Sequence, residues 1–394
     1  MNQPLLLREA ESLSGSLSAW RRDLHQHPEL GFHEQRTAGV IAQSLRELGL
    51  EVQTGVAETG VVAVVEGGHP GPTLLLRWDM DALPILETTG AAYASLEPGK
   101  MHACGHDGHV AIGLGVARLL HEHRDEMHGR VKLVFQPAEE GLGGAERMIA
   151  AGALEGPTPA IALGVHLWNS RPVGWVGITD GPMIAGAEVF EIEIRGQGGH
   201  GAAPHQTHDP VVAAAQVIVA LQTVVARNVE PRAAAVVSVT QIHGGEAFNV
   251  IPERVVLRGT IRTFEPEVRQ TVLRRVEQVA VGVAGAMDCT ARVRLTPLTP
   301  PVVNDPAIAG RVRAVARRVL PATSIAESER SMVSDDMAFF LQSVPGCFMF
   351  VGSANAARGL DAAHHNSGFD FDEAALPRAV ALLTAAAIDL LVNS

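Results

Sequence analysis

The chain has 394 residues, of which 46% are hydrophobic but only 4% aromatic, and its formal net charge is −12. This length predicts about two domains, and a core that Val, Ala and Leu must fill favours an α/β fold over an all-β one. The acidic charge argues against nucleic acid or an anionic lipid surface as a partner, because both carry the same sign of charge.

Cysteine usage and the N-terminal residues bear on the compartment. Cys104, Cys289 and Cys347 are odd in number and widely spaced, so they do not form a disulfide framework and favour a reducing compartment. The start, MNQPLLLREAESL, lacks the basic residues followed by an apolar run that mark a secretory signal. No stretch reaches about 18 uninterrupted apolar residues, the length that spans a bilayer. We therefore expect a soluble, cytoplasmic protein with no membrane partner.

In the first half of the chain, helical and strand-like patterns alternate. Apolar residues recur at helical spacing over 5–24, 37–48 and 107–123. Short apolar runs that end in turn residues predict buried strands, and they lie at 61–68, 73–84, 131–141 and 161–168. This alternation predicts a layered α/β domain.

Beyond residue 186 the pattern changes. EVFEIEIRGQ (188–197) alternates apolar and charged residues, which is typical of a half-exposed strand. The segments that follow predict helices at 210–226 and 267–286 and strands at 233–244, 253–263 and 290–297. That order is β-α-β-β-α-β, the split βαβ unit. The buried α/β pattern then resumes, with a strand at 345–353 and a helix at 377–391. We expect a main domain made of 1–186 and 298–394, with a smaller domain, 187–297, inserted into it.

The motif MHACGHDGH places Cys104 and His106 two residues apart, just before a predicted helix. There both side chains can converge on one point. A thiolate and an imidazole suit Zn, Mn, Co or Ni better than Mg or Ca. An isolated Cys-x-His pair fits equally well a buried structural cysteine beside a helix-capping turn.

The adjacent Glu139 and Glu140 follow a predicted strand in QPAEEGLGG. Two carboxylates in one cleft repel each other unless a cation lies between them. One can then ligate a metal while the other accepts a proton from water. The alternative is a solvated charge pair in a turn, which the apolar VFQPA before it and the Gly-rich backbone after it disfavour.

Three further segments carry polar side chains near the ends of predicted strands. In WDMD, Asp79 and Asp81 share one strand face, where a carboxylate can orient a metal-ligating histidine. His166 ends a buried strand, and His364 and His365 precede the last helix; each of these histidines alone also fits a hydrogen-bonded structural role. All the segments fall at the carboxyl edge of one predicted sheet, where open α/β sheets bind ligands. This coincidence predicts one shared site.

Together these segments resemble the hippurate hydrolase family, which includes indole-acetyl-amino-acid hydrolases and belongs to the aminoacylase-like dinuclear metallopeptidases. The similarity covers nearly the whole chain. It is carried by RRDLHQHPELGF, RWDMDALPI, MHACGHDGH, QPAEEG, GVHLW, GGHGAAPH, AFNVIPE, GTIR and a final HH-x-x-x-F-x-x-DE pattern. Glu188 and the HNSG run at 365–368 depart from commoner family wording, which bears on substrate preference rather than on the chemistry.

The resemblance implies two divalent ions per subunit, Mn or Zn, with Co or Ni as alternatives. Cys104 would bridge them. Glu140 and His365 would complete one metal site, and His106 and His166 the other.

The resemblance also implies roles in catalysis and substrate binding. Glu139 would be the general base and Asp81 the carboxylate that orients a ligand. In the inserted domain, His200 would reach an active site as a lid residue and stabilise the oxyanion, and Asn249 and Arg262 would bind substrate. This lid domain commonly pairs with another subunit, so we expect a homo-oligomer.

The expected function is hydrolysis of an N-acyl amino acid, a small-molecule substrate, to a carboxylic acid and a free amino acid by a metal-activated water. The nearest alternative is a dinuclear dipeptidase or exopeptidase. A non-catalytic module that binds an amino-acid conjugate is a third possibility, but it would need no base such as Glu139. A structural zinc site is disfavoured because such sites are usually closed and Cys-rich.

Overall fold

The computed structural model describes residues 3–320 and 322–392, which separate into two compact units that are described here individually. Unit 1 consists of Met1–Met183, Val302–Glu329 and Asp335–Ser394, and unit 2 of Ile184–Pro301 and Arg330–Ser334. Residues 1–2, 321 and 393–394 of the expected main domain lie outside the described part. The expected insertion, 187–297, lies inside the longer segment of unit 2. The return of the chain into unit 2 at Arg330–Ser334 was not expected.

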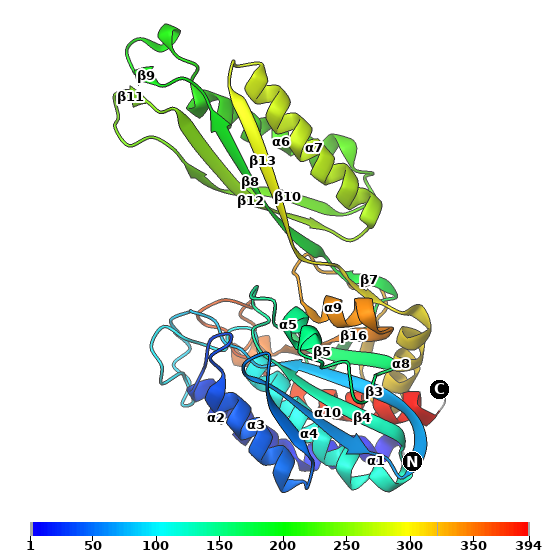
Figure 1. Cartoon of the computed structure of the whole chain (residues 1–394). Coiled ribbons are helices and arrows are strands. Elements are labelled where there is room, and N and C mark those ends of the chain that lie inside the picture. The colour runs from blue at the N-terminus through cyan, green and yellow to red at the C-terminus, as the bar shows by residue number, and fades with distance from the viewer. Residues whose placement is uncertain (1–2, 321, 393–394) are drawn as a thin grey trace. The chain divides into compact units, whose positions relative to one another are not determined.

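Unit 1 is built on an eight-stranded sheet in the order β1-β2-β4-β3-β5-β16-β6-β15 (Figure 1). Its strands are β1 (Val52–Val56), β2 (Gly60–Glu66), β3 (His69–Asp79), β4 (His128–Gln136), β5 (Ile161–Pro172), β6 (Trp175–Gly177), β15 (Ser324–Ala326) and β16 (Gly346–Ala354). The central strands β4, β3, β5 and β16 run parallel. They are buried on both faces, which explains their nearly continuous apolar sequences.

Helices cover both faces of this sheet, so the expected layered α/β architecture is confirmed. They are α1 (Gln3–Ser12), α2 (Ser14–Gln26), α3 (Gln35–Glu47), α4 (His106–Glu122), α5 (Gly144–Ala150), α8 (Pro306–Val319), α9 (Met337–Ser343) and α10 (Ala375–Val392). Helices α3, α4 and α10 pack against one face of the sheet, and the shorter α5 and α9 lie on the other (Figure 1).

Two details of unit 1 differ from the sequence prediction. The helix expected over 5–24 is two helices, α1 and α2, which meet at Leu13. Ser12 and Ser14 on either side donate side-chain hydrogen bonds to backbone carbonyls three residues earlier, and such bonds compete with a continuous helix. The strand expected over 131–141 ends at Gln136, since the following Pro137 has no N–H for the ladder.

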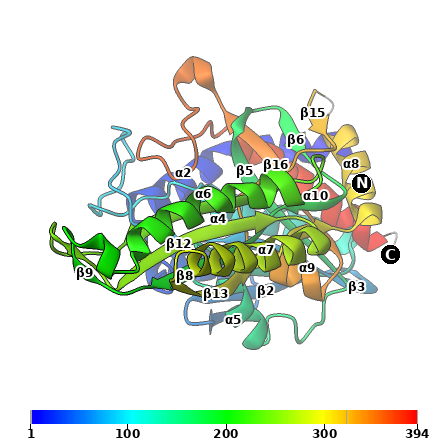
Figure 2. The same cartoon turned by 90° about the horizontal axis from the view of Figure 1, so that it is seen from above.

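Unit 2 has the order β8 (Gly186–Arg195), α6 (Pro210–Asn228), β10 (Ala235–His243), β12 (Arg254–Thr263), α7 (Pro266–Gly285) and β13 (Thr290–Thr299), which is the predicted β-α-β-β-α-β pattern. The strands form an antiparallel sheet in the order β10-β12-β8-β13. Helices α6 and α7 run side by side over one face (Figure 2). Their Val217, Leu221 and Val276 pack with Phe190 and Leu257 of the sheet in a core separate from that of unit 1.

Three smaller features complete the description. A short ladder joins β9 (Gly199–His200) to β11 (Val250–Ile251), and another joins β7 (Gly181–Ile184) to β14 (Val302–Asn304). By length and composition alone, α6 and α10 are apolar enough to cross a bilayer. Helix α10 is nevertheless mostly buried within unit 1, as a core helix is.

Candidate metal centre

The site lies where the parallel strands of unit 1 end. Asp79 ends β3 directly beside Gln136, the last residue of β4. The pairing of Arg77 with Gly164 places Asp79 level with His166 of β5. We expected His166 at the end of its strand, but β5 continues to Pro172, so this histidine is held inside the strand by the neighbouring β16. The common carboxyl edge of parallel strands thus brings together residues far apart in sequence.

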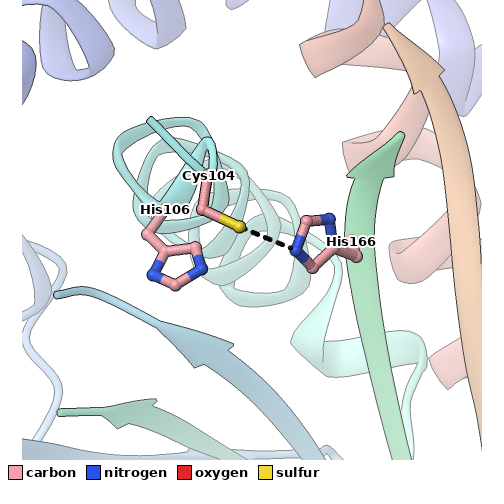
Figure 3. A group of neighbouring side chains, drawn as sticks. All are labelled: Cys104, His106 and His166. Carbon is pink, nitrogen blue, oxygen red and sulfur yellow. Dashed lines mark hydrogen bonds between the residues drawn. The ribbon is translucent and has the colours of Figure 1, made fainter. Parts of the chain in front are cut away.

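Cys104, His106 and His166 form one group whose ligand atoms all lie within 4.8 Å of one another. The Cys104 Sγ points at His166 Nε2 over 3.5 Å (Figure 3). Cys104 and His106 flank Gly105, whose φ of 90° is a left-handed conformation that glycine adopts without strain. That turn delivers both side chains at the start of α4.

The hydrogen bonds of His106 and His166 leave the Nε2 atom of each ring available on the side where Cys104 lies. His166 Nδ1 lies 2.6 Å from the Leu167 carbonyl oxygen, and His106 Nδ1 lies 2.9 Å from the carbonyl oxygen of Asp81. Each Nδ1 therefore donates, which leaves Nε2 as the electron-pair donor. His106 Nε2 is buried without a hydrogen-bond partner among the described residues. Because buried nitrogens are rarely left unpaired, this donor set fits a cation.

Cys104, Glu140 and His365 form a second group, again within 4.8 Å. His365 Nε2 is 3.2 Å from Glu140 Oε1. The backbone of His365 is held in a left-handed conformation (φ 64°) and donates its N–H to the carbonyl of Ala103 over 2.8 Å. Cys104 belongs to both groups, so its sulfur lies between two sets of donors. All five residues predicted as metal ligands are therefore in these two groups.

Glu139 lies beside both groups. It is more exposed to solvent than Cys104, His106 and His166, which are buried. Its carboxylate forms a further group with Glu140 and His106 within 4.8 Å. Desolvation and the neighbouring carboxylates of Asp335 and Glu140 raise the pKa of Glu139 well above its usual value. A raised carboxyl pKa is typical of groups that exchange protons during catalysis.

A buried charge network that the sequence analysis missed lies behind the site. Arg77 donates to Asp79 Oδ2 and to Asp336 Oδ1, each over 2.7 Å, and is 3.3 Å from Asp335. Asp79 Oδ1 lies 2.5 Å from His109 Nδ1, so His109 of the MHACGHDGH motif hydrogen-bonds a carboxylate. The one signal for Asp335 and Asp336 was an adjacent acidic pair in SMVSDDMAFF, before an apolar helix.

A second buried network fixes the start of α4. Both ring nitrogens of His25 face carboxylates, Asp107 Oδ2 at 2.7 Å and Glu87 Oε1 at 3.3 Å. Arg21 donates to Asp107 over 2.9 Å and to Asp370 over 2.6 Å. Burial lowers the pKa of His25, but the two carboxylates outweigh burial and raise it to about 9. His25, near the end of α2, therefore ties this helix and the segment that carries Glu87 to the start of the helix that carries His106.

In unit 2 the structure separates the predicted substrate-binding residues into two places. His200 and Asn249 are exposed at the β9–β11 ladder, where the Asn249 carbonyl accepts the Gly201 N–H over 2.8 Å. Strand β12 begins at Arg254, close in sequence to the β9–β11 ladder. Arg262 lies eight residues further along this strand, a distance of roughly 25 Å in an extended chain. It is half-buried, and its Nη1 has no hydrogen-bond partner in the described part of the chain.

Comparison with known proteins gives one family. Residues 75–389 match the model of peptidase family M20/M25/M40. An N-acetyl-L-cysteine deacetylase of Bacillus subtilis is 42% identical over 93% of this chain and 86% of its own length. The IAA-amino acid hydrolase ILR1-like 4 of Arabidopsis thaliana is 42% identical over 92% of this chain and 82% of its own.

A solved structure supports the same assignment. The YXEP protein of Bacillus subtilis, described as a dinuclear metal binding peptidase from the M20 family, superposes with a TM-score of 0.85 at 35% identity. The match covers 98% of this chain and 100% of the other. The similarity to this family that was visible in the sequence motifs is thus confirmed.

Proposed function

The chain belongs to peptidase family M20/M25/M40, and we propose that it is a metal-dependent amidohydrolase that cleaves N-acyl amino acids to a carboxylic acid and a free amino acid. The observation that carries the proposal is the position of Cys104, shared by two groups of donor atoms next to Glu139. The relatives described as an N-acetyl-L-cysteine deacetylase and an IAA-amino acid hydrolase add support, since both names specify an acylated amino acid.

We propose that His106 and His166 hold one divalent cation, that Glu140 and His365 hold another, and that Cys104 contacts both. Such cations supply Lewis acidity, which makes water acidic enough to lose a proton near neutral pH and polarises an amide carbonyl. Thiolate and imidazole donors favour Mn, Zn, Co or Ni over Mg and Ca. The protein's contribution is to fix these donors, with Asp81 orienting His106.

In this scheme Glu139 moves the proton. Its carboxylate accepts a proton from the attacking water and returns it to the leaving amine. Burial and the neighbouring Asp335 and Glu140 raise the pKa of Glu139, which is the direction that favours a carboxylate that accepts a proton and then returns it. The backbone N–H of Asp336 lies 3.4 Å from Glu139 Oε1 and limits its rotation.

For substrate binding we propose that His200 stabilises the oxyanion and that Asn249 and Arg262 contact the substrate. Arg262 is half-buried, and its Nη1 is buried without a hydrogen-bond partner among the described residues, which supports recognition of the free carboxylate. Guanidinium groups hold carboxylates through paired charge-assisted hydrogen bonds. Recognition by one local cation also suits a protein whose overall charge is −12, which offers no general attraction for an anion.

We further propose that unit 2 pairs with unit 2 of a second copy. Helix α6 exposes Val211, Val212 and Val219, and it carries no charged residue between 211 and 226. Strand β10 is at the edge of its sheet, where unpaired backbone groups can extend the ladder. Val219→Glu should shift the protein toward monomer in analytical ultracentrifugation, while Gln270→Glu on exposed α7 should not.

We also propose that the protein is located in the cytoplasm. The three cysteines are free and buried, which fits a reducing compartment such as the cytoplasm.

The second candidate is a dipeptidase or exopeptidase, which the description of the YXEP protein as a peptidase favours. A panel of acetyl, benzoyl and indole-acetyl amino acids, tested beside dipeptides on enzyme loaded with Mn, Zn, Co or Ni, separates the two. We expect acyl amino acids to be cleaved faster, and their methyl esters or amides poorly. Arg262→Ala should lose most of this preference for the free acid, and Arg262→Lys, which keeps the charge but not the planar fork, should bind the acid poorly. Faster cleavage of dipeptides would assign the peptidase activity instead.

A further inference from the structure

The segment that carries Glu139 and Glu140 is held by three carboxylates from separate parts of unit 1. Asp81 Oδ2 accepts the N–H of Glu140 over 3.1 Å, and Asp336 Oδ2 accepts that of Ala145 over 2.9 Å. Glu34 Oε1 accepts the N–H of Ala138 over 2.9 Å, from a position 104 residues away in the sequence. Asp81 and Asp336 have other contacts at the site, whereas nothing so far explains Glu34.

Ala138 is the residue whose backbone sets the direction of Glu139. Its φ of 55° is in the left-handed region, which an alanine adopts only when its surroundings hold it there. The space around it is tight, since a Cβ built on Gly31 would lie 3.0 Å from both Cα and Cβ of Ala138. The hydrogen bond from Ala138 to Glu34 is therefore part of what maintains an unfavourable turn.

The Glu34 side chain is itself completely fixed. It has no solvent exposure, and its second oxygen, Oε2, accepts the Thr59 hydroxyl over 2.6 Å. Burial raises the pKa of Glu34, so keeping a carboxylate at this position is costly. Glu34 stands at the N-cap of α3, but its side chain makes no capping hydrogen bond there. Helix capping therefore does not account for it.

We propose that Glu34 is a positioning residue that holds the Ala138 N–H and so fixes where Glu139 and Glu140 point. The inference rests on the proposed function, in which Glu139 is the base and Glu140 a metal ligand. Glu34 would thus act in the reaction, although the segment that carries it (HQHPELGFHE, residues 25–34) contributes no group to the site itself.

Kinetics of two substitutions test this role. Glu34→Ala removes the acceptor and should lower kcat by roughly 10–100-fold at saturating metal, because small displacements of catalytic groups are costly. KM should change by less than about threefold, since substrate contacts remain. Glu34→Gln keeps a carbonyl oxygen for the Ala138 N–H, and its amide can donate to the Thr59 hydroxyl, so kcat should stay within about threefold of wild type. Thr59→Val is the matched control, because it removes only the hydrogen bond to Glu34 Oε2 and leaves the one from the Ala138 N–H.

Hydrogen exchange on the metal-free protein gives a readout that needs no substrate. Peptides covering 137–145 should exchange faster in Glu34→Ala, and at the wild-type rate in Glu34→Gln. If Glu34→Ala does not fold, Glu34→Asp replaces it, because its shorter side chain withdraws the acceptor by about 1.5 Å. Unchanged exchange together with unchanged kcat in folded Glu34→Ala, or in folded Glu34→Asp, would overturn the inference. Altered exchange in an enzyme that hydrolyses no acyl amino acid would instead overturn the proposed function.

Discussion

His106 Nδ1 lies 3.2 Å from Asp81 Oδ1, while Nε2 of the same ring is buried with no hydrogen-bond partner among the described residues. The carboxylate and the Asp81 backbone carbonyl, which lies 2.9 Å from the same Nδ1, together select the tautomer that leaves Nε2 free to bind a metal ion. Asp81 also accepts the N–H of Glu140 through its other oxygen over 3.1 Å. One aspartate thus orients a residue of each proposed metal site.

From this relationship we expect Asp81→Asn to weaken metal binding by about 10–100-fold, the usual effect of losing a carboxylate behind a ligating histidine. Titration of the metal-free protein with Zn or Mn measures it. Asp125→Asn is the control, because the Asp125 side chain is 90% exposed and, among the described residues, forms an ion pair only with the surface Arg124. Equal metal affinity in Asp81→Asn and wild type would contradict the assignment.

Glu139→Gln should retain both metals yet lose about 10²–10⁴-fold in kcat, because the amide keeps the shape of the side chain but cannot accept the proton. Elemental analysis and steady-state kinetics on the same preparation test this. Glu146→Gln, an exposed residue of the following helix, should behave as wild type. A fully metallated Glu139→Gln enzyme with normal kcat would exclude Glu139 as the base.

Cys104→Ser should lose metal and activity together, because its sulfur contacts both groups of donors. Cys289→Ser, at a cysteine buried in the separate core of unit 2, should keep both metals. Chelation of wild type should abolish turnover, and added Mn or Zn should restore it. Two metals per chain in Cys104→Ser would remove Cys104 from the site.

Mixing two inactive variants tests the role of His200. If His200 acts on the site of a second copy, a heterodimer of His200→Ala and Glu139→Gln has one site with both defects and one with neither. Partial activity should then return, up to about half per heterodimer on this count of sites. Heterodimers that form but remain inactive would place His200 in its own subunit's site or outside catalysis.

The charge on His25 should make stability depend on pH. Its pKa is raised to about 9 in the folded protein, above the ordinary value of about 6.5. Its stabilising contribution, on the order of 3 kcal/mol, is therefore complete below pH 6.5 and lost as pH rises to about 9. The difference in Tm between wild type and His25→Gln, measured without metal, should shrink over this range. A difference that does not vary with pH would contradict this.

The sequence alone determined the classes of element and which donor groups could be proposed as metal ligands. Buried parallel strands require continuous apolar runs and half-exposed antiparallel strands require alternation, so residue pattern suffices to distinguish β3, β4 and β5 from β8 and β12. Cys104, Glu140 and His365 could be proposed as ligands because their segments fall at one predicted sheet edge and resemble the hippurate hydrolase family, which implies these roles.

Only the tertiary structure decided how these residues are held. Nothing local in Glu34, Asp335 or Asp336 indicates that their carboxylates meet the turn at Ala138 or the guanidinium of Arg77. A carboxylate is normally solvated, and it becomes a fixed support only when distant segments bury it and supply donors. The tautomer of His106 likewise depends on Asp81. Chain pattern specifies which groups are available, whereas packing between remote segments sets their orientation and charge.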